Sequence, residues 1–365
     1  MEAEPTRAPG DAAASVTDGP PVDRAPRERA KAHIRDVARA AGVSHQTVSR
    51  VLNNQTSVRP ATRDRVLHAI RELDYRPSVT ARAMNTGRTN VLGVITFDDV
   101  RYGPVSVLHG IGEAAWERGY LVSAVAPRSL QPSGVAQVVD RLIDQAVDAV
   151  IVIAAQEWLA RAVADMLPDM PTVMLDQSFD DRIPAISVDE IHGGRLAVEH
   201  LLSLGHSTVW HVAGPDGWIA ASERLSGWRS ALMDAGATVP EPLFGDWSAD
   251  SGYELGRQLA QRREVTAVFA ANDQMALGLV HALYDGGRRV PDDVSVVGFD
   301  DIPEATHLLP PLTTVRPDFV EVGRLCLTAA LEQLGPQGAP VGRRVVAPDL
   351  VVRRSCGPPA PRDRG

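Results

Sequence analysis

The sequence predicts a small all-α helix-turn-helix head joined to an α/β body of two Rossmann-like lobes. Between residues 34 and 73, apolar residues recur at helical spacing in three short segments separated by turn residues. From residue 91 onward, short apolar runs alternate with amphipathic segments, which is typical of parallel sheets covered by helices. The 365 residues suffice for two or three domains, and 44% hydrophobic with 23% charged residues is usual for globular proteins.

Residues 1–30 are predicted to be a disordered tail because they are rich in Pro, Ala and charge and contain few side chains that form a core. They lack the apolar segment of a secretory signal, and no apolar run in the chain reaches the ~18 residues of a membrane span. Only two cysteines occur, Cys326 and Cys356. We therefore expect a cytoplasmic protein with no disulfide framework, no metal site and no membrane contact.

Residues 31–77 are predicted to form the helix-turn-helix domain. The first helix ends at Gly42, the second starts after Ser44 as its N-cap, and the third starts at Pro60. In such a domain the second helix enters the major groove of DNA with its N-terminal residues leading.

The side chains on that second helix suit the reading of bases. His45, Gln46 and Thr47 lead the helix, and Arg50 follows one turn later. Gln pairs well with adenine and Arg with guanine. The surrounding charge agrees, since residues 31–88 carry eleven basic and four acidic residues, a net charge of +7, in a chain of net charge -9. A basic head on an acidic body indicates binding to a polyanion.

Residues 78–88 are predicted to be a hinge helix. The segment carries Ala81 and Met84 and is too short to be stable alone in water, so we expect it to become helical on contact with DNA.

The body is predicted to span residues 89–354, with a disordered tail at 355–365 and a crossover between the lobes at 313–319. One lobe is expected to comprise residues 89–188 and 319–347, and the other residues 189–318 and 348–354. The predicted buried strands are 91–97, 120–126, 148–154, 171–176, 209–214, 267–272 and 294–300.

Polar residues follow several of these strands, where α/β folds bind ligands. They are Asp176, the pair Asn272 and Asp273, and the pair Asp300 and Asp301, with Arg224 and Trp247 in the connections. Carboxylates and amides pair with hydroxyls, and an indole face covers an apolar sugar face, so a hydroxylated, uncharged ligand is expected.

Enzyme motifs are weak in this sequence. Gly110-Ile111-Gly112 imitates a dinucleotide fingerprint but begins about a dozen residues after the preceding strand. The Asp pairs at 292–293 and 300–301 lack the spacing of a calcium loop, and His206 follows a helix end, where a packing role is expected. We predict no enzymatic activity and no cofactor.

The segment HIRDVARAAGVSHQTVSRVLNNQTSVRPATRDRVLHAIRELDYRPSVTARAM resembles the DNA-binding headpiece of the lactose-repressor (LacI/GalR) family. The similarity continues through AVEHLLSLGH, GDWSADSGYE, ANDQMALG, VPDDVSVVGFDD and PPLTTVRPDF to about Arg354. The resemblance implies a ligand-controlled transcription factor, usually a repressor, whose body has the periplasmic-binding-protein fold.

The resemblance also implies roles for individual residues. The implied base-reading residues are His45, Gln46 and Arg50, the backbone-contacting residues are Ser44, Thr47, Ser49, Asn53 and Thr62, and the hinge residues are Ala81 and Met84. The implied effector-binding residues are Phe97, Asp176, Arg224, Trp247, Asn272, Asp300 and Phe319.

Four positions depart from the family's lactose-type pattern. Met84 stands where that pattern has a hinge leucine, and His45 where it has a tyrosine, so the operator is expected to differ at that base pair. Phe97 replaces a serine and Val188 a phenylalanine, which changes the expected pocket shape. The tetramerising leucine-heptad tail has no counterpart after Arg354, so the resemblance implies a homodimer and a pseudo-palindromic operator.

Three functions remain open from the sequence. The first is a repressor induced by a sugar of galactoside type, and the second is a corepressor-dependent regulator of the same family. The third is a sugar-binding α/β protein whose basic head binds another polyanion. The sign of the ligand's effect on operator affinity separates the first two, and salt-sensitive binding without sequence preference favours the third.

Overall fold

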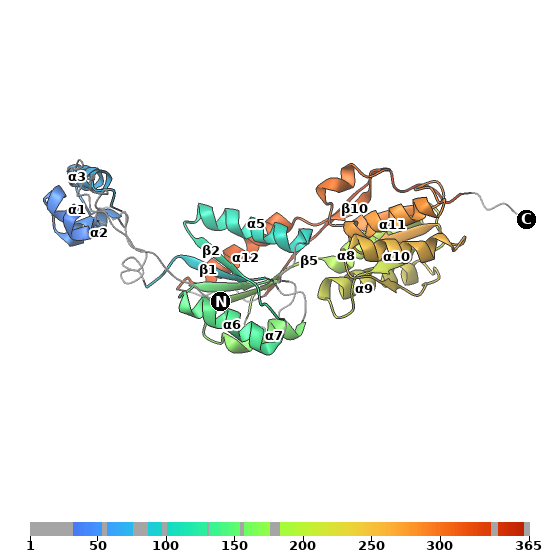
Figure 1. The fold of residues 1–365 in the computed structure, drawn as a ribbon, viewed down its shortest axis with the longest axis horizontal. Helices are drawn as coiled ribbons and strands as arrows, with labels where there is room; N and C mark the ends of the chain where they lie inside the picture. Colours follow the sequence, from blue (N-terminus) through green and yellow to red (C-terminus); the bar gives the residue numbers. More distant parts are fainter. Residues whose placement is uncertain are drawn as a thin grey trace, which may run out of the picture. The chain divides into compact units, whose positions relative to one another are not determined.

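The structure is a computed structural model that describes residues 32–52, 57–75, 87–96, 101–129, 131–153, 157–175, 183–336 and 342–360. The chain divides into two units, Met1–Ala81 and Arg82–Gly365 (Figure 1). The predicted tail at 1–30 and most of the predicted hinge helix at 78–88 lie outside the described residues.

Three short helices form the described part of the first unit. Gly42 has a φ of +62°, a left-handed conformation that suits glycine, and it ends the first helix as the sequence predicts. The third helix ends at Glu72, and Leu73 and Asp74 form the turn that follows it. The helices are α1 (Ile34–Ala41), α2 (His45–Leu52) and α3 (Pro60–Glu72). They pack on a shared core of Val37, Ala38, Ala41, Val48, Val51, Val66, Ala69 and Tyr75.

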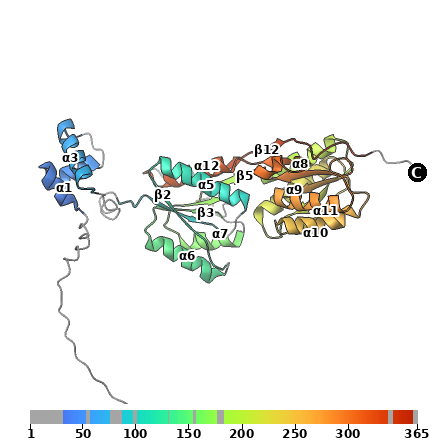
Figure 2. The same cartoon turned by 45° about the horizontal axis from the view of Figure 1, so that its top comes forward.

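The first lobe of the second unit is a six-stranded parallel sheet in the order β11-β5-β4-β3-β1-β2. Helices α5 and α12 cover one face of this sheet, and α6 and α7 cover the other (Figures 1 and 2). The strands are β1 (Val91–Ile95), β2 (Leu121–Val125), β3 (Ala149–Val152), β4 (Thr172–Leu175), β5 (Ala185–Val188) and β11 (Arg343–Val346). The helices are α5 (Tyr102–Glu117), α6 (Pro132–Asp144), α7 (Glu157–Met166) and α12 (Phe319–Gln333).

The second lobe is another six-stranded sheet, in the order β12-β10-β9-β8-β6-β7, and it is parallel except for β12. Helices α8 and α9 pack on one face, and α10 and α11 pack on the other. The strands are β6 (Trp210–Ala213), β7 (Leu243–Phe244), β8 (Ala267–Ala270), β9 (Ser295–Phe299), β10 (Thr313–Arg316) and β12 (Asp349–Val351). The helices are α8 (Glu190–Ser203), α9 (Ile219–Asp234), α10 (Ala249–Ala260), α11 (Asp273–Asp285) and the 3-10 helix η1 (Pro303–Thr306).

The chain passes between the two sheets three times. It leaves the first sheet after β5, returns between β10 and α12, and leaves again between β11 and β12. The sequence predicts a crossover over the whole of 313–319, but residues 313–316 form strand β10 of the second sheet. The crossing itself therefore takes two residues, 317 and 318.

Of the two glycines that imitate a dinucleotide fingerprint, Gly110 serves helix packing. A Cβ on Gly110 of α5 would lie 2.4 Å from the carbonyl oxygen of Val320, and a Cβ on Gly323 of α12 would lie 2.4 Å from the carbonyl oxygen of Val107. Glycine at these two positions lets α5 and α12 approach closely. Gly112 has no atom within 4 Å of such a Cβ, so it is not required by this contact.

The end of the body extends beyond its predicted limit at 354. Ser355 is fully buried, and its hydroxyl donates to the carbonyl of Val296 at 2.6 Å. His206 is also buried, and its Nε2 lies 3.0 Å from the carbonyl oxygen of Gly357. The tail predicted at 355–365 is therefore wrong for its first residues, because their polar groups complete the second lobe. His206 is a packing histidine, and burial lowers its pKa.

Candidate functional site

A pocket opens between the two lobes, where the carboxyl ends of the strands face each other. The wall from the first lobe is mainly apolar, with one cation, and the wall from the second lobe carries most of the polar groups. The first lobe contributes Arg101, Gly103, Pro104, Val107, Ile153, Leu175, Val188, Phe319 and Val322. The second lobe contributes Glu190, Trp218, Ala220, Arg224, Trp247, Asn272 and Asp300. A concave site with few convergent polar groups is typical of small-molecule binding.

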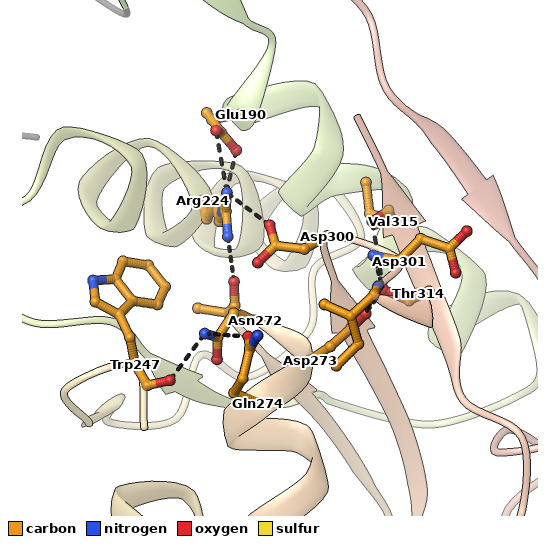
Figure 3. Close-up of polar contacts among 12 residues, drawn as sticks. Glu190, Arg224, Trp247, Asn272, Asp273, Gln274, Asp300, Asp301, Thr314 and Val315 are labelled. Carbon is orange, nitrogen blue, oxygen red and sulfur yellow. Dashed lines mark hydrogen bonds and ion pairs between the residues drawn. The ribbon is translucent and has the colours of Figure 1, made fainter. Parts of the chain in front are cut away.

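Arg224 is the centre of the polar wall (Figure 3). It lies in α9, is 5% exposed, and donates from Nε to one Glu190 carboxylate oxygen at 2.7 Å and from Nη2 to the other at 3.2 Å. Its Nη1 donates to the carbonyl of Ala271 at 2.5 Å, and Nη2 lies 3.4 Å from Asp300 Oδ1. The guanidinium also lies over the ring of Phe299, 3.6 Å from its centroid. These contacts hold the arginine in one orientation.

Asp300 is a buried carboxyl at the end of β9. Its pKa is raised to about 7, mainly by burial; the Arg224 guanidinium lowers it and the Glu190 carboxylate raises it by smaller amounts. Its backbone has a φ of +104°, a conformation that L-residues adopt at a cost. A carboxyl group in this state can donate or accept a hydrogen bond near neutral pH.

Asn272 joins a helix cap to the pocket. Its Oδ1 accepts from the Met275 N–H at 2.9 Å and so caps α11. Its Nδ2 donates to the carbonyl of Trp247 at 3.0 Å and to the side chain of Gln274 at 3.0 Å (Figure 3). Trp247 has a φ of +74°, so this bond holds it in a conformation that is unusual for tryptophan.

The Trp247 indole is 6% exposed and packs tightly beside a glycine. A Cβ on Gly214 would lie 2.3 Å from the indole ring, so the ring needs glycine there. Trp218 meets it edge to face at 6.2 Å, and the guanidinium of Arg101 lies 4.2 Å from the Trp218 centroid. Among the described residues, the Trp247 Nε1–H has no hydrogen-bond acceptor.

Two of the strand-end carboxylates point away from the pocket. Asp273 is buried, accepts from the Thr314 hydroxyl at 2.6 Å and from the Ile302 N–H at 2.9 Å, and its pKa is raised well above the usual range by burial. Asp301 pairs with Arg353 at 2.6 Å. Both carboxylates fasten the connections after β9 and do not line the site.

Five of the seven effector candidates line this one pocket: Arg224, Trp247, Asn272, Asp300 and Phe319. Phe97 and Asp176 lie outside the described residues. Sequence reasoning missed Arg101, Glu190 and Trp218. Glu190 carries the same signal as Asp300, an acid after a strand, but its strand β5 was not among the predicted strands.

The DNA-binding candidates lie mostly on α2 and its flanks. Ser44 accepts from the Thr47 N–H at 3.2 Å and lies 3.0 Å from the Thr47 hydroxyl, so both side chains belong to the start of the helix. His45, Gln46 and Arg50 are exposed and lie opposite the buried Val48 and Val51. Ser49 and Thr62 are half-buried, and Asn53, Ala81 and Met84 lie outside the described residues.

In the described part of the chain, no group of three or more His, Cys, Asp or Glu side chains is placed to hold a metal ion. Within the same residues, no helix is long and apolar enough to cross a membrane.

Both units of this chain are similar to known proteins. A model of bacterial regulatory proteins of the lacI family matches residues 33–78, and a periplasmic binding protein-like domain matches residues 198–356. The lactose operon repressor of Escherichia coli strain K12 is 35% identical over 325 residues, which is 88% of this chain and 89% of that protein. This chain belongs to the LacI family. It is a DNA-binding transcriptional regulator with an effector-binding body.

Other relatives agree with this LacI-family assignment. The transcriptional repressor PurR of Haemophilus influenzae (strain Rd) is 32% identical over 334 residues, 89% of this chain and 98% of that one. The lac repressor dimer bound to operator and an anti-inducer has a TM-score of 0.81 at 34% identity, covering 90% of this chain and 100% of that chain. The regulator CelR in complex with cellobiose has a TM-score of 0.68 at 32% identity, covering 89% and 100%. These relatives are transcriptional regulators, which agrees with the prediction of a non-enzymatic protein.

Proposed function

We propose that this LacI-family protein is a repressor that leaves a pseudo-palindromic operator when a sugar of galactoside type binds between its lobes. The division of the pocket carries this proposal. One lobe supplies the polar network around Arg224 and the other an apolar wall with Phe319. A ligand that touches both walls binds one arrangement of the lobes better than another, and this difference in affinity is what an allosteric effector requires.

The chemistry of the walls suits an uncharged, hydroxylated ligand. Asp300 and Asn272 offer carboxyl and amide groups to hydroxyls. Trp247 and Phe319 supply aromatic surface for the apolar face of a sugar ring. The solved relative CelR holds cellobiose, which supports a glycoside as the ligand class.

The DNA-binding half of the proposal rests on the exposed face of α2. Gln46 and Arg50 are exposed where the second helix of this domain type meets base edges, with His45 beside them. We assign the phosphate backbone to Ser44, Thr47, Ser49, Asn53 and Thr62, and the minor groove to Ala81 and Met84. We also propose a homodimer, as in the solved lac repressor dimer, because a two-fold dimer matches a pseudo-palindromic site.

The ligand is found first by a thermal-shift panel of galactosides, glucosides, other sugars and purines on the purified chain. A ligand at ~100 times its dissociation constant stabilises the protein by roughly 2.7 kcal/mol, which raises the melting temperature visibly. Operator DNA is then selected from a random duplex pool, and fluorescence anisotropy measures its affinity with and without that ligand.

Induction predicts that saturating sugar weakens operator binding by roughly 5- to 150-fold. The Arg224→Ala and Asn272→Ala variants should bind operator normally and fail to release it at low sugar. Tighter operator binding in the presence of ligand would show a corepressor-dependent regulator instead. Salt-sensitive binding with no preference among duplexes would favour a head that binds another polyanion.

A further inference from the structure

Glu190 is a buried acid in the pocket that the sequence did not single out. It is the first residue of α8, is 4% exposed, and lines the cavity beside Arg224 and Asp300. Figure 3 shows its carboxylate meeting the Arg224 guanidinium with both oxygens, at 2.7 and 3.2 Å. This two-bond fork is the geometry with which arginine recognises carboxylates and phosphates.

Every nitrogen of the Arg224 guanidinium already has a partner within the second lobe. Nε and Nη2 bond to Glu190, Nη2 also faces Asp300 at 3.4 Å, and Nη1 donates to the Ala271 carbonyl. An anionic group that enters the pocket must displace Glu190 to reach the fork. It would then leave a buried carboxylate without its cation, which is costly, and it would lie beside two acids.

We propose that Glu190 is a specificity-determining residue that excludes anionic sugars, namely uronic acids and sugar phosphates, by occupying Arg224. The inference rests on the proposed sugar-binding function and deepens it. Neutral hydroxyls do not need the guanidinium fork and bind the remaining carboxyl and amide acceptors. Glu190 therefore acts mainly by making the wrong ligands unfavourable, and it costs the neutral ligand little.

Arg101 is a second cation in the pocket, and it would attract an anionic sugar. Its guanidinium lies over Trp218 on the rim of the same cavity and is the cation that an anionic sugar would meet in place of Arg224. Exclusion by Glu190 and attraction by Arg101 therefore act in opposite directions. The wild-type protein's preference between a neutral sugar and its charged counterpart measures which effect is larger.

Isothermal titration of the full chain with matched sugar pairs tests the proposal. The pairs are methyl β-galactoside against methyl β-galacturonide, and glucose against glucose 6-phosphate. We expect wild type to bind the neutral member at least about tenfold more tightly, since an anionic ligand must displace the charge-assisted hydrogen bonds between Glu190 and Arg224. Glu190→Gln keeps the size of the side chain and one hydrogen-bond acceptor, but it removes the negative charge that neutralises the Arg224 guanidinium. It should therefore reduce the preference for the neutral sugar about tenfold or more.

Two matched variants separate this effect from general changes. Glu190→Asp keeps the charge and should keep the wild-type ratio. Glu199→Gln removes the same charge from the same helix, where Glu199 is half exposed and pairs with Arg195 at 2.8 Å, and should also keep the ratio. If Glu190→Gln does not fold, the affinity ratios of wild type and Glu190→Asp still test the proposal. A preference for the anionic sugar in either protein would contradict it.

The outcomes distinguish this inference from the proposed function. If neutral sugars bind but Glu190→Gln leaves the ratio unchanged, the role of Glu190 is overturned and sugar binding stands. If wild type prefers the anionic member, the role of Glu190 is overturned and Arg101 becomes the anion's partner. If no sugar of either charge binds wild type, the proposed function fails, and this inference falls with it.

Discussion

Replacing Asn272 by alanine removes three side-chain hydrogen bonds beside the pocket, two of them to backbone groups. The lost cap of α11, a bond of 2.9 Å to Met275, costs about 1 kcal/mol. The lost bond of 3.0 Å to the Trp247 carbonyl, which is buried, costs about another 1 kcal/mol. We therefore expect Asn272→Ala to lower the free energy of unfolding by roughly 2 kcal/mol.

Asn272→Ser is the matched variant, because serine keeps a cap acceptor but lacks the amide donor. It should cost about 1 kcal/mol, half the effect of alanine. Urea unfolding of the full chain followed by tryptophan fluorescence measures both values, with the slope against urea concentration expected to stay constant.

Sugar affinity gives a second test of the same residue. Both variants lose the amide that holds Trp247 at its positive φ, so both should lose affinity by the same factor, measured by isothermal titration. Equal destabilisation by serine and alanine would refute the capping argument. Wild-type affinity in Asn272→Ser would refute the argument that the amide positions Trp247.

Three further predictions follow from other parts of the molecule. Gly110→Ala should destabilise the protein by about 1–3 kcal/mol, because its Cβ would lie 2.4 Å from the Val320 carbonyl oxygen, whereas Gly112→Ala in the same helix should stabilise it by about 0.5–1 kcal/mol. Thermal melts compare the two, and similar shifts would contradict the packing explanation. Asp300 has a pKa of about 7 in the folded protein and near 4 when unfolded, so the folded state holds the extra proton between these values and stability falls as pH rises through this window. Asp300→Asn should remove that contribution, so its stability relative to wild type, from urea titrations, should grow from pH 5 to 7 and level off above; parallel curves would disprove the pKa assignment. Arg50→Ala should lose roughly 1–3 kcal/mol of discrimination at one base pair, measured by anisotropy on operators substituted one position at a time, and uniform weakening at every position would make Arg50 a phosphate contact instead.

The sequence predicts the fold class because its local signals are strong. The glycine after α1, the serine before α2 and the proline at the start of α3 each act through the nearest turn of the chain. The long apolar runs of β1, β3 and β9 are likewise local. Strands β11 and β12 are different, because β11 reads RRVV with alternating exposure and gains its place only by pairing with β5. Its partner strand lies 158 residues earlier in the chain, so the pairing leaves no signal in the local sequence.

The same limit explains the candidate site. A rule about strand ends finds Asn272, Asp273, Asp300 and Asp301 together, but it does not tell which side chains turn into the pocket. The direction depends on tertiary partners: Thr314 and Ile302 hold Asp273, and Asn272 turns toward Trp247. Arg224 is found through the family resemblance, whereas its partner Glu190 is not, because its strand β5 was not among the predicted strands.

The threefold passage of the chain between the sheets has a consequence for synthesis on the ribosome. The first lobe begins at β1 but needs α12 and β11, which lie more than 200 residues later, to cover one face of its sheet and complete its edge. The core residues Val322, Cys326 and Leu327 of α12 are among its most buried. The second lobe, by contrast, has all but β12 in one continuous stretch, from α8 to β10. The lobe that is synthesised first is therefore completed late, with one apolar sheet face covered only by α5 while the second lobe is still being made.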